Sequence, residues 1–361
     1  MAVHSDWGFQ AGAYAEFKTS SIPSFDAAVV SPSANLEWHE CYTADSLSST
    51  RDSFQHAFSH PSFSKSRTFS CARLTLPLDY HNSTNSHNVN VPILKASSAP
   101  SPSHLGTIMT AFGGAGNSRI QDFTTMSYGG FLDLIDPEFE YDFITFDNRG
   151  FGYSSPTAKC FDNVLDGVLF EERMMDLGGV MSSCDGDEGM RVRIAAARAK
   201  GELCLSRSEE DGDIRRYMST AYVARDMLEI LKRIPGQSSK SFDSSSVKSR
   251  DGEIVKLKFI GLSYGTMVGQ IFASLYPEYV SRMVLDGTGD AKDWAAKWQM
   301  GHLIDTDAVW ASFYDDCFNA KEVCPLWQIS DSKLEDIETR IIFFLEGLKQ
   351  RPLYTVADGS A

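Results

Sequence analysis

The chain has 361 residues, of which 42% are hydrophobic and 22% charged, a composition typical of a folded globular protein rather than a disordered or fibrous one. Its formal net charge is −15, and it has no Lys/Arg-rich cluster of the kind a nucleic-acid-binding protein presents. No apolar run approaches the ~20 residues of a membrane-spanning helix. We therefore expect neither a nucleic-acid nor a membrane partner, and the oligomeric state stays open.

Residues 1–30 lack the basic stretch and the long apolar stretch of a secretory signal. This favours a cytoplasmic location, and a different true N-terminus would leave a secreted protein open. The seven cysteines include no C-x-x-C pair and no zinc-type spacing. In a reducing compartment they are expected to be mostly buried, reduced thiols.

The first half of the chain reads as a loose arm followed by short strands. Residues 1–35 are rich in Ser and Ala and are expected to form a loosely ordered N-terminal arm. Residues 157–215 are mixed and polar, and are interpreted as a helical or loop insertion. Apolar runs of strand length lie between these segments. They are Phe69–Leu76, Val89–Leu94, Leu105–Phe112 and Tyr141–Phe146.

The second half alternates between helix and strand patterns. Ser219–Ile234 has a broad apolar face at helical spacing, and residues 237–252 are Ser-rich and read as a flexible loop. Strand, helix and strand patterns follow at Val255–Ile260, Thr266–Leu275 and Val280–Leu285. This alternation predicts an α/β core, residues 36–290, with a mostly parallel sheet and helices on both faces. Residues 291–361 are expected to begin a helical cap.

Residues 261–265 read G-L-S-Y-G between the predicted strand and the predicted helix. A G-x-S-x-G sequence in that context is the nucleophile elbow, a sharp turn that exposes a reactive serine. The small neighbours let strand and helix approach, and the N-terminus of the helix favours negative charge developing at the serine. Ser263 is therefore the candidate catalytic nucleophile.

Two further segments follow predicted strands. The glycine-rich turn at residues 113–116 is placed to supply a backbone N–H to an oxyanion hole, from Gly113 or Gly114, and Tyr264 after the nucleophile would supply the other. Asp147 and Arg149 follow the strand Tyr141–Phe146 and are interpreted as a structural pair that holds the loop beside these glycines.

Three motifs follow one another along the chain: the glycine-rich turn, D-x-R-G-x-G-x-S at residues 147–154 and G-x-S-Y-G-T at residues 261–266. Together with L-P-L-D-Y at residues 76–80 and V-L-D-G at residues 284–287, they resemble the tripeptidyl-aminopeptidase and proline-iminopeptidase-like branch of the α/β-hydrolases. The resemblance runs from about Trp38 to the end of the chain. It implies an α/β-hydrolase fold and a serine hydrolase acting on peptide N-termini or related amide and ester bonds. It also implies disulfides Cys41–Cys71 and Cys317–Cys324 if the protein is secreted.

The chain departs from this family in two places. Its first loop lacks the usual proline, and residues 237–252 look like an insertion. The triad order in this fold is Ser, then Asp or Glu, then His, yet the only histidine after Ser263 is His302, in the expected cap. The C-terminal strands that would present the acid and the base are expected to be missing.

Three interpretations therefore stay open. In the first, the chain is part of a longer serine hydrolase. In the second, it is a catalytically inactive homologue with a binding or accessory role. In the third, it is an active hydrolase with an unusual base, such as His302 or a residue of a partner chain. The substrate is a peptide or small molecule. Aminopeptidase chemistry is favoured, and an esterase or thioesterase of a small metabolite in secondary metabolism is the alternative. The glycine turn is not G-x-G-x-x-G, and no Walker motif or metal cluster occurs, so no cofactor or metal is expected.

Overall fold

A computed structural model of the chain describes residues 30–42, 67–98, 104–128, 130–176, 186–207, 212–234, 255–296 and 301–351. Most of the predicted arm 1–35 and the whole predicted loop 237–252 lie outside these residues. The chain divides into two compact units, residues 1–289 and 290–361. Within the described residues, no helix combines the length and the apolar character needed to cross a membrane.

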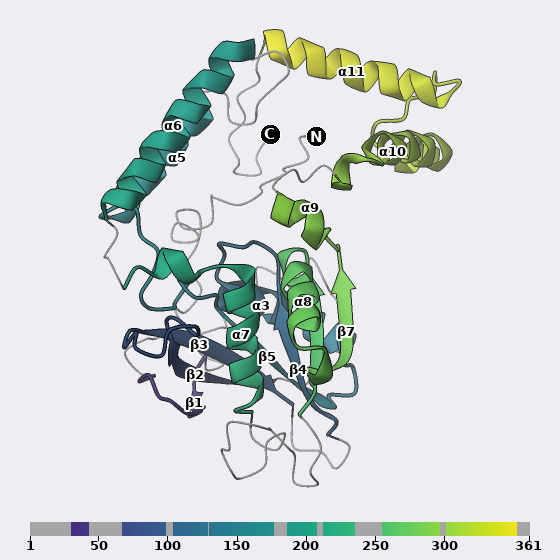
Figure 1. Cartoon of the computed structure of the whole chain (residues 1–361). Coiled ribbons are helices and arrows are strands. Elements are labelled where there is room, and N and C mark those ends of the chain that lie inside the picture. The colour runs from purple at the N-terminus through teal and green to yellow at the C-terminus, as the bar shows by residue number, and fades with distance from the viewer. Residues whose placement is uncertain are drawn as a thin grey trace. The chain divides into compact units, whose positions relative to one another are not determined.

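The first unit is built on a seven-stranded sheet in the order β1-β2-β3-β5-β4-β6-β7 (Figure 1). The strands are β1 (His39–Glu40), β2 (Thr68–Pro77), β3 (Asn88–Ser97), β4 (Gly106–Ala111), β5 (Tyr141–Phe146), β6 (Leu257–Leu262) and β7 (Val280–Asp286). β4, β5, β6 and β7 are mutually parallel, whereas β1, β2 and β3 pair antiparallel and β3 joins β5 antiparallel. The predicted, mostly parallel sheet is confirmed.

Helices connect the strands of this unit. They are α3 (Arg119–Tyr128), α4 (Phe131–Ile135), α5 (Val164–Asp176), α6 (Gly186–Ser206), α7 (Thr220–Leu231) and α8 (Tyr264–Leu275), with short 3-10 turns η1 (Ile214–Tyr217) and η2 (Pro277–Tyr279). The α7 helix begins one residue after Ser219, as the apolar spacing predicts, and buries the face that includes Val223, Met227 and Leu231.

Both faces of the sheet are covered. On one face, Ile120 and Phe123 of α3 and Leu132 of α4 pack in a buried cluster with strand side chains that include Leu94 and Phe143. The alternation of side chains along a strand sends the neighbouring residues to the other face. There α8 lies so close that a Cβ on Gly265 would stand 1.9 Å from the backbone oxygen of β4's last residue.

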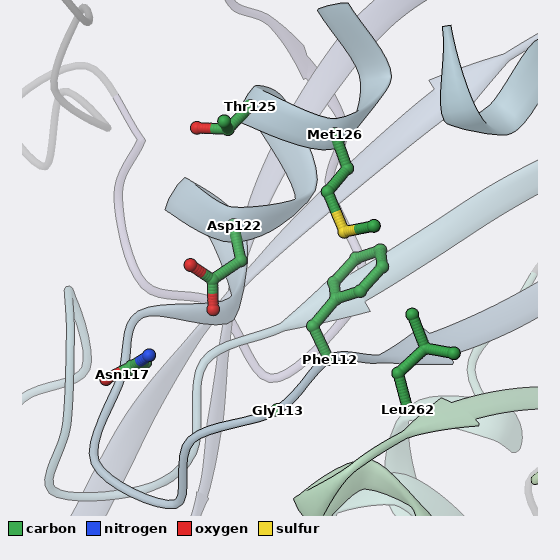
Figure 2. A pocket seen from close by; sticks show the side chains of 7 residues that line it. All are labelled: Phe112, Gly113, Asn117, Asp122, Thr125, Met126 and Leu262. Carbon is green, nitrogen blue, oxygen red and sulfur yellow. The ribbon is translucent and has the colours of Figure 1, made fainter. Parts of the chain in front are cut away.

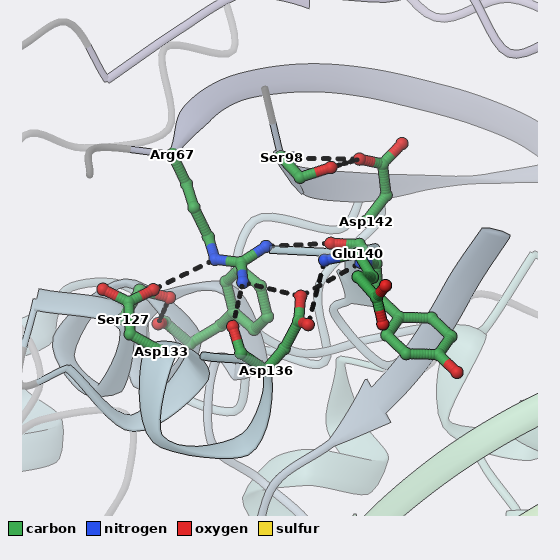
Figure 3. A network of polar contacts seen from close by, with 9 residues as sticks. Arg67, Ser98, Ser127, Asp133, Asp136, Glu140 and Asp142 are labelled. Carbon is green, nitrogen blue, oxygen red and sulfur yellow. Dashed lines mark hydrogen bonds and ion pairs between the residues drawn. The ribbon is translucent and has the colours of Figure 1, made fainter. Parts of the chain in front are cut away.

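Arg67 ties the start of β2 to the segment that leads into β5 (Figure 3). Its guanidinium donates to Asp133 of α4 at 3.2 Å, to Asp136 at 2.9 Å and to the Tyr141 carbonyl at 2.8 Å. The Asp136 carboxylate in turn accepts from the Glu140 and Tyr141 backbone N–H groups. This network lies at the amino end of β5, the end opposite the glycine-rich turn, and is structural.

The second unit is helical. Its elements are α9 (Ala291–Ala296), η3 (Gly301–Leu303), α10 (Thr306–Ala320), η4 (Lys321–Val323) and α11 (Leu334–Gln350). Tyr314 and Cys317 of α10 pack with Ile337 of α11 in a small core. Arg340 of α11 pairs with Asp331 at 2.7 Å, which closes the turn before the helix.

Three disulfides overturn the expectation of reduced thiols. Cys41–Cys71 and Cys317–Cys324 form as the family resemblance implies. Cys160–Cys204 links the start of the predicted insertion to α6 and was not foreseen. The expectation of reduced thiols rests on residues 1–30 alone. Those residues say nothing about which cysteines the fold brings close together.

Candidate active site

Ser263 sits at the turn between β6 and α8, as predicted. Its backbone has φ 51° and ψ −117°, a conformation that non-glycine residues rarely adopt. The Ser263 N–H donates to the Asp286 carbonyl at the end of β7 at 3.0 Å, and its own carbonyl accepts from the Thr266 hydroxyl at 2.6 Å. Such strain persists only where the surroundings hold it, and a strained serine between a strand and a helix is the geometry expected of a nucleophile elbow.

The two glycines of the turn are required by space. A Cβ on Gly261 would lie 2.6 Å from the Gly265 carbonyl oxygen and 2.7 Å from the Phe259 ring. A Cβ on Gly265 would lie 1.9 Å from the Ala111 carbonyl oxygen. Only hydrogen fits at either position, so the G-x-S-x-G spacing is what lets α8 leave the sheet this sharply.

The glycine-rich turn after β4 touches the serine. A Cβ on Gly113 would stand 2.9 Å from Ser263 Cβ and 3.2 Å from Ser263 Oγ. Gly114 has φ +77°, and its carbonyl accepts from the Asn117 N–H at 3.2 Å. The Asn148 side chain donates to the Ala115 carbonyl and so fixes the position of the turn. The two segments predicted to form an oxyanion hole are thus brought together.

Tyr264, the first residue of α8, is almost fully buried. Its hydroxyl lies 3.1 Å from the Thr220 hydroxyl at the start of α7. The fully buried Arg119 guanidinium stands 5.7 Å from the Tyr264 ring and 5.3 Å from the Phe146 ring. Within the described residues none of its three nitrogens has a hydrogen-bond partner. The rings and the carboxylates of Asp147 and Asp122 compensate part of its charge, and burial lowers the pKa of Arg119 to about 10.

Asp147, at the end of β5, is completely buried and holds the loops around it. Its carboxylate accepts from the Ser118 hydroxyl at 3.0 Å, the Ile120 N–H at 3.0 Å and the Tyr153 N–H at 2.8 Å. Burial raises the pKa of Asp147 to about 6, and these hydrogen bonds offset part of that rise. The arrangement joins the start of α3 to the segment after β5.

Arg149 corrects one prediction, because it does not pair with Asp147. Its guanidinium makes a bidentate, fully buried ion pair with Asp226 of α7, at 2.7 and 2.6 Å. Asp226 also accepts from the Tyr80 hydroxyl at 2.6 Å, and Tyr80 and Tyr222 lie against the guanidinium. The partner lies 77 residues away, a distance that local sequence patterns do not bridge.

Ser263 Oγ makes no hydrogen bond with any residue of the described part of the chain. His302 belongs to η3 in the second unit, and its side chain lies outside the described residues. Among the described residues, no group of three or more His, Cys, Asp or Glu side chains is arranged to hold a metal ion.

Sequence reasoning missed three charged side chains near the site. Arg119 and Asp122 lie in the first turn of α3, a helix for which no signal was read, and Asp226 lies on the buried face of a predicted helix. A charged residue on an otherwise apolar helical face was the available signal for Asp226.

The sheet order, the covered faces and the strained serine turn define an α/β-hydrolase fold. The chain is similar to tripeptidyl aminopeptidases of Streptomyces lividans and Streptomyces coelicolor, each 30% identical over 146 residues, and this confirms the resemblance read from the motifs. These alignments cover 40% of the chain but only 22% and 21% of the two relatives. No protein-family model matches the chain.

Solved structures similar to the chain include two hydrolases. A probable hydrolytic enzyme of Pseudomonas aeruginosa is 16% identical, with 63% of this chain and 44% of that chain covered and a TM-score of 0.31. A putative alpha/beta hydrolase of Nostoc is 12% identical, with 77% and 59% covered and a TM-score of 0.29. At these TM-scores the fold assignment rests on the chain's own sheet order and serine turn.

Proposed function

We propose that the chain is a serine hydrolase that cleaves amide or ester bonds through an acyl-enzyme, with Ser263 as the nucleophile. The observation that carries this proposal is the strained, positive-φ backbone of Ser263 at the β6–α8 turn. Strained residues of this kind cluster at active sites, and a G-x-S-x-G turn between a strand and a helix is where an α/β-hydrolase carries its nucleophile.

The chemistry follows from the neighbouring backbone. Ser263 Oγ attacks the substrate carbonyl, and its proton passes to a base. The carbonyl oxygen becomes an oxyanion, for which the N–H groups of Tyr264 and of Gly113 or Gly114 are the proposed donors. Collapse of the tetrahedral intermediate breaks the bond to the leaving amine or alcohol, which takes up the proton. Water then hydrolyses the acyl-enzyme by the same steps in reverse order.

The general base is part of the proposal. A serine hydroxyl is a weak nucleophile without one, so an imidazole or an equivalent group must reach Ser263 Oγ. His302 and a residue of a partner chain are the candidates that the sequence leaves open. A binding role without catalysis is the second candidate function that the sequence leaves open.

Aminopeptidase-type specificity, the release of N-terminal residues or short peptides, is the favoured form of the activity. It is supported by the similarity to tripeptidyl aminopeptidases, 30% identical over 146 residues. Ester or thioester hydrolysis of a small metabolite uses the same acyl-enzyme chemistry and is the alternative.

The test compares turnover of fluorogenic peptide amides that carry a free N-terminus with their N-acetylated forms and with p-nitrophenyl esters. We expect turnover of the free-amine peptides, abolished by Ser263→Ala and retained by Ser274→Ala, an exposed serine at the other end of α8. Turnover of esters alone would contradict the aminopeptidase proposal. Turnover that survives Ser263→Ala would contradict the assignment of the nucleophile.

A further inference from the structure

A pocket of about 290 Å³ lies beside the glycine-rich turn, and it is lined only by residues of the first unit. Figure 2 shows its walls: Phe112 and Gly113 after β4, Asn117 and the α3 side chains, and Leu262 at the end of β6. Leu262 precedes Ser263 directly, and the Gly113 backbone contacts the Ser263 side chain. The pocket therefore opens beside the candidate nucleophile.

The lining divides into an apolar part and a polar part. Phe112, Met126 and Leu262 form the apolar part, and Asn117, Asp122 and Thr125 form the polar part. Asp122 is the one charged side chain among these lining residues. A ligand group that fits the pocket is therefore cationic or neutral and carries a short apolar arm, whereas an anionic group would face the carboxylate.

Asp122 lacks an ion-pair partner within the described residues. The charges that face it are Asp147 at the end of β5 and Arg119 on its own helix, and Asn117 donates a side-chain hydrogen bond to it. Burial, followed by the charge of Asp147, raises the pKa of Asp122 to about 7. A carboxyl group kept in this setting opposes folding when it ionises, which is common for groups retained for function.

We propose that this pocket is a subsite for a primary ammonium group of the substrate, with Asp122 as its counter-ion. The three ammonium donors are matched by the carboxylate of Asp122 and the oxygen acceptors of Asn117 and Thr125. The carbon chain next to the ammonium packs on Phe112, Met126 and Leu262. The proposal rests on the proposed function, since it places a substrate amine next to Ser263.

The experiment measures binding, so it does not depend on catalysis. The probe is n-butylammonium, compared with n-butanol of the same length, and the protein is the whole chain carrying Ser263→Ala. Binding is followed through the methyl resonance of Met126 in methionine-labelled protein, assigned with Met126→Leu. We expect n-butylammonium to shift this resonance saturably and n-butanol to bind at least about tenfold more weakly.

Two perturbations test the counter-ion. Asp122→Asn is expected to weaken n-butylammonium binding about tenfold, whereas the control Asp133→Asn, a carboxylate of α4 that pairs with Arg67, leaves it unchanged. Because the probe keeps its charge to about pH 10 while Asp122 ionises near pH 7, affinity is expected to rise about eightfold from pH 5.5 to pH 8.5, approaching the tenfold difference between charged and neutral Asp122. Asp122→Asn is also expected to raise the melting temperature at pH 8, because it removes the buried carboxylate. Removal of a purely structural carboxylate would lower the melting temperature.

Equal binding of n-butanol and n-butylammonium, or a flat pH profile in the parent, would overturn the subsite even if Asp122→Asn failed to fold. Unchanged binding by a folded Asp122→Asn variant would do the same. These outcomes are separate from those of the proposed function: a chain without hydrolase activity still binds the probe if the subsite exists, and an active hydrolase without the subsite does not.

Discussion

Removal of Arg149 should destabilise the first unit far more than removal of an ordinary surface cation. The Arg149–Asp226 pair is fully buried, and Arg149 also donates to the Leu78 carbonyl at 2.8 Å. Among the described residues, Arg149→Met leaves the buried Asp226 carboxylate with the Tyr80 hydroxyl as its remaining partner. An uncompensated buried charge of this kind costs about 3–5 kcal/mol.

The matched control is Lys232→Gln, at the C-terminal end of α7, the helix that carries Asp226. Lys232 lies 3.4 Å from Glu229, which keeps Arg225 and Arg233 as partners after the change. The expected loss is below about 0.5 kcal/mol. The assay is hydrogen exchange of β5 and α7 amides, which reports the free energy of opening of this unit by itself.

The double variant Arg149→Met/Asp226→Leu removes both charges and should be more stable than Arg149→Met alone, by about 2 kcal/mol or more. If Arg149→Met costs no more than the Lys232→Gln control, or if the losses of Arg149→Met and Asp226→Leu measured singly add up to the loss of the double variant, the buried pair does not stabilise the fold as described.

Three further predictions concern the elbow, a disulfide and a buried acid. Gly265→Ala should cost more than about 3 kcal/mol or abolish folding, because its Cβ would lie 1.9 Å from a carbonyl oxygen of β4. The control Gly201→Ala on α6 has open space around its Cβ and should be neutral or stabilising. Equal melting temperatures of the two variants would contradict this prediction. Loss of the Cys41–Cys71 disulfide, which spans 30 residues, should lower the free energy of unfolding by about 2–4 kcal/mol. Because three disulfides pair six of the seven cysteines, thiol titration of the unreduced, denatured chain should find at most one free thiol. More free thiols would contradict the pairing. Asp147 has a folded-state pKa of about 6, above its unfolded value of about 3.9, so its contribution to stability is full below pH ~4 and declines by about 2–3 kcal/mol as the pH rises through 6. Asp122 adds a decline of its own, so hydrogen exchange should show a smaller loss of stability over this range in Asp147→Asn than in the parent, and an equal loss would contradict the prediction.

The elements that the sequence predicted well are those with strong local patterns. The strand runs at Leu105–Phe112 and Tyr141–Phe146 correspond closely to β4 and β5, and the G-x-S-x-G turn places Ser263 at the end of β6. Each of these follows from alternation, from buried apolar length or from a backbone requirement that only glycine meets. The local pattern also located the glycine-rich turn whose backbone touches the serine.

What the sequence did not predict depends on distant contacts. The helix α3 has a weakly patterned sequence and is stabilised by packing of Ile120 and Phe123 on the sheet. The Arg149–Asp226 pair spans 77 residues, and the Cys160–Cys204 disulfide spans 44. No short-range spacing encodes such partners, because the fold brings them together.

The most direct test of the central claim is labelling by a fluorophosphonate probe, which reacts with an activated serine. The parent chain is compared with Ser263→Ala and with Ser274→Ala, the exposed serine of the same helix. The account predicts labelling of the parent and of Ser274→Ala, with a mass increase on Ser263 and none in Ser263→Ala. Absence of labelling in folded parent protein, or equal labelling of Ser263→Ala, would contradict it.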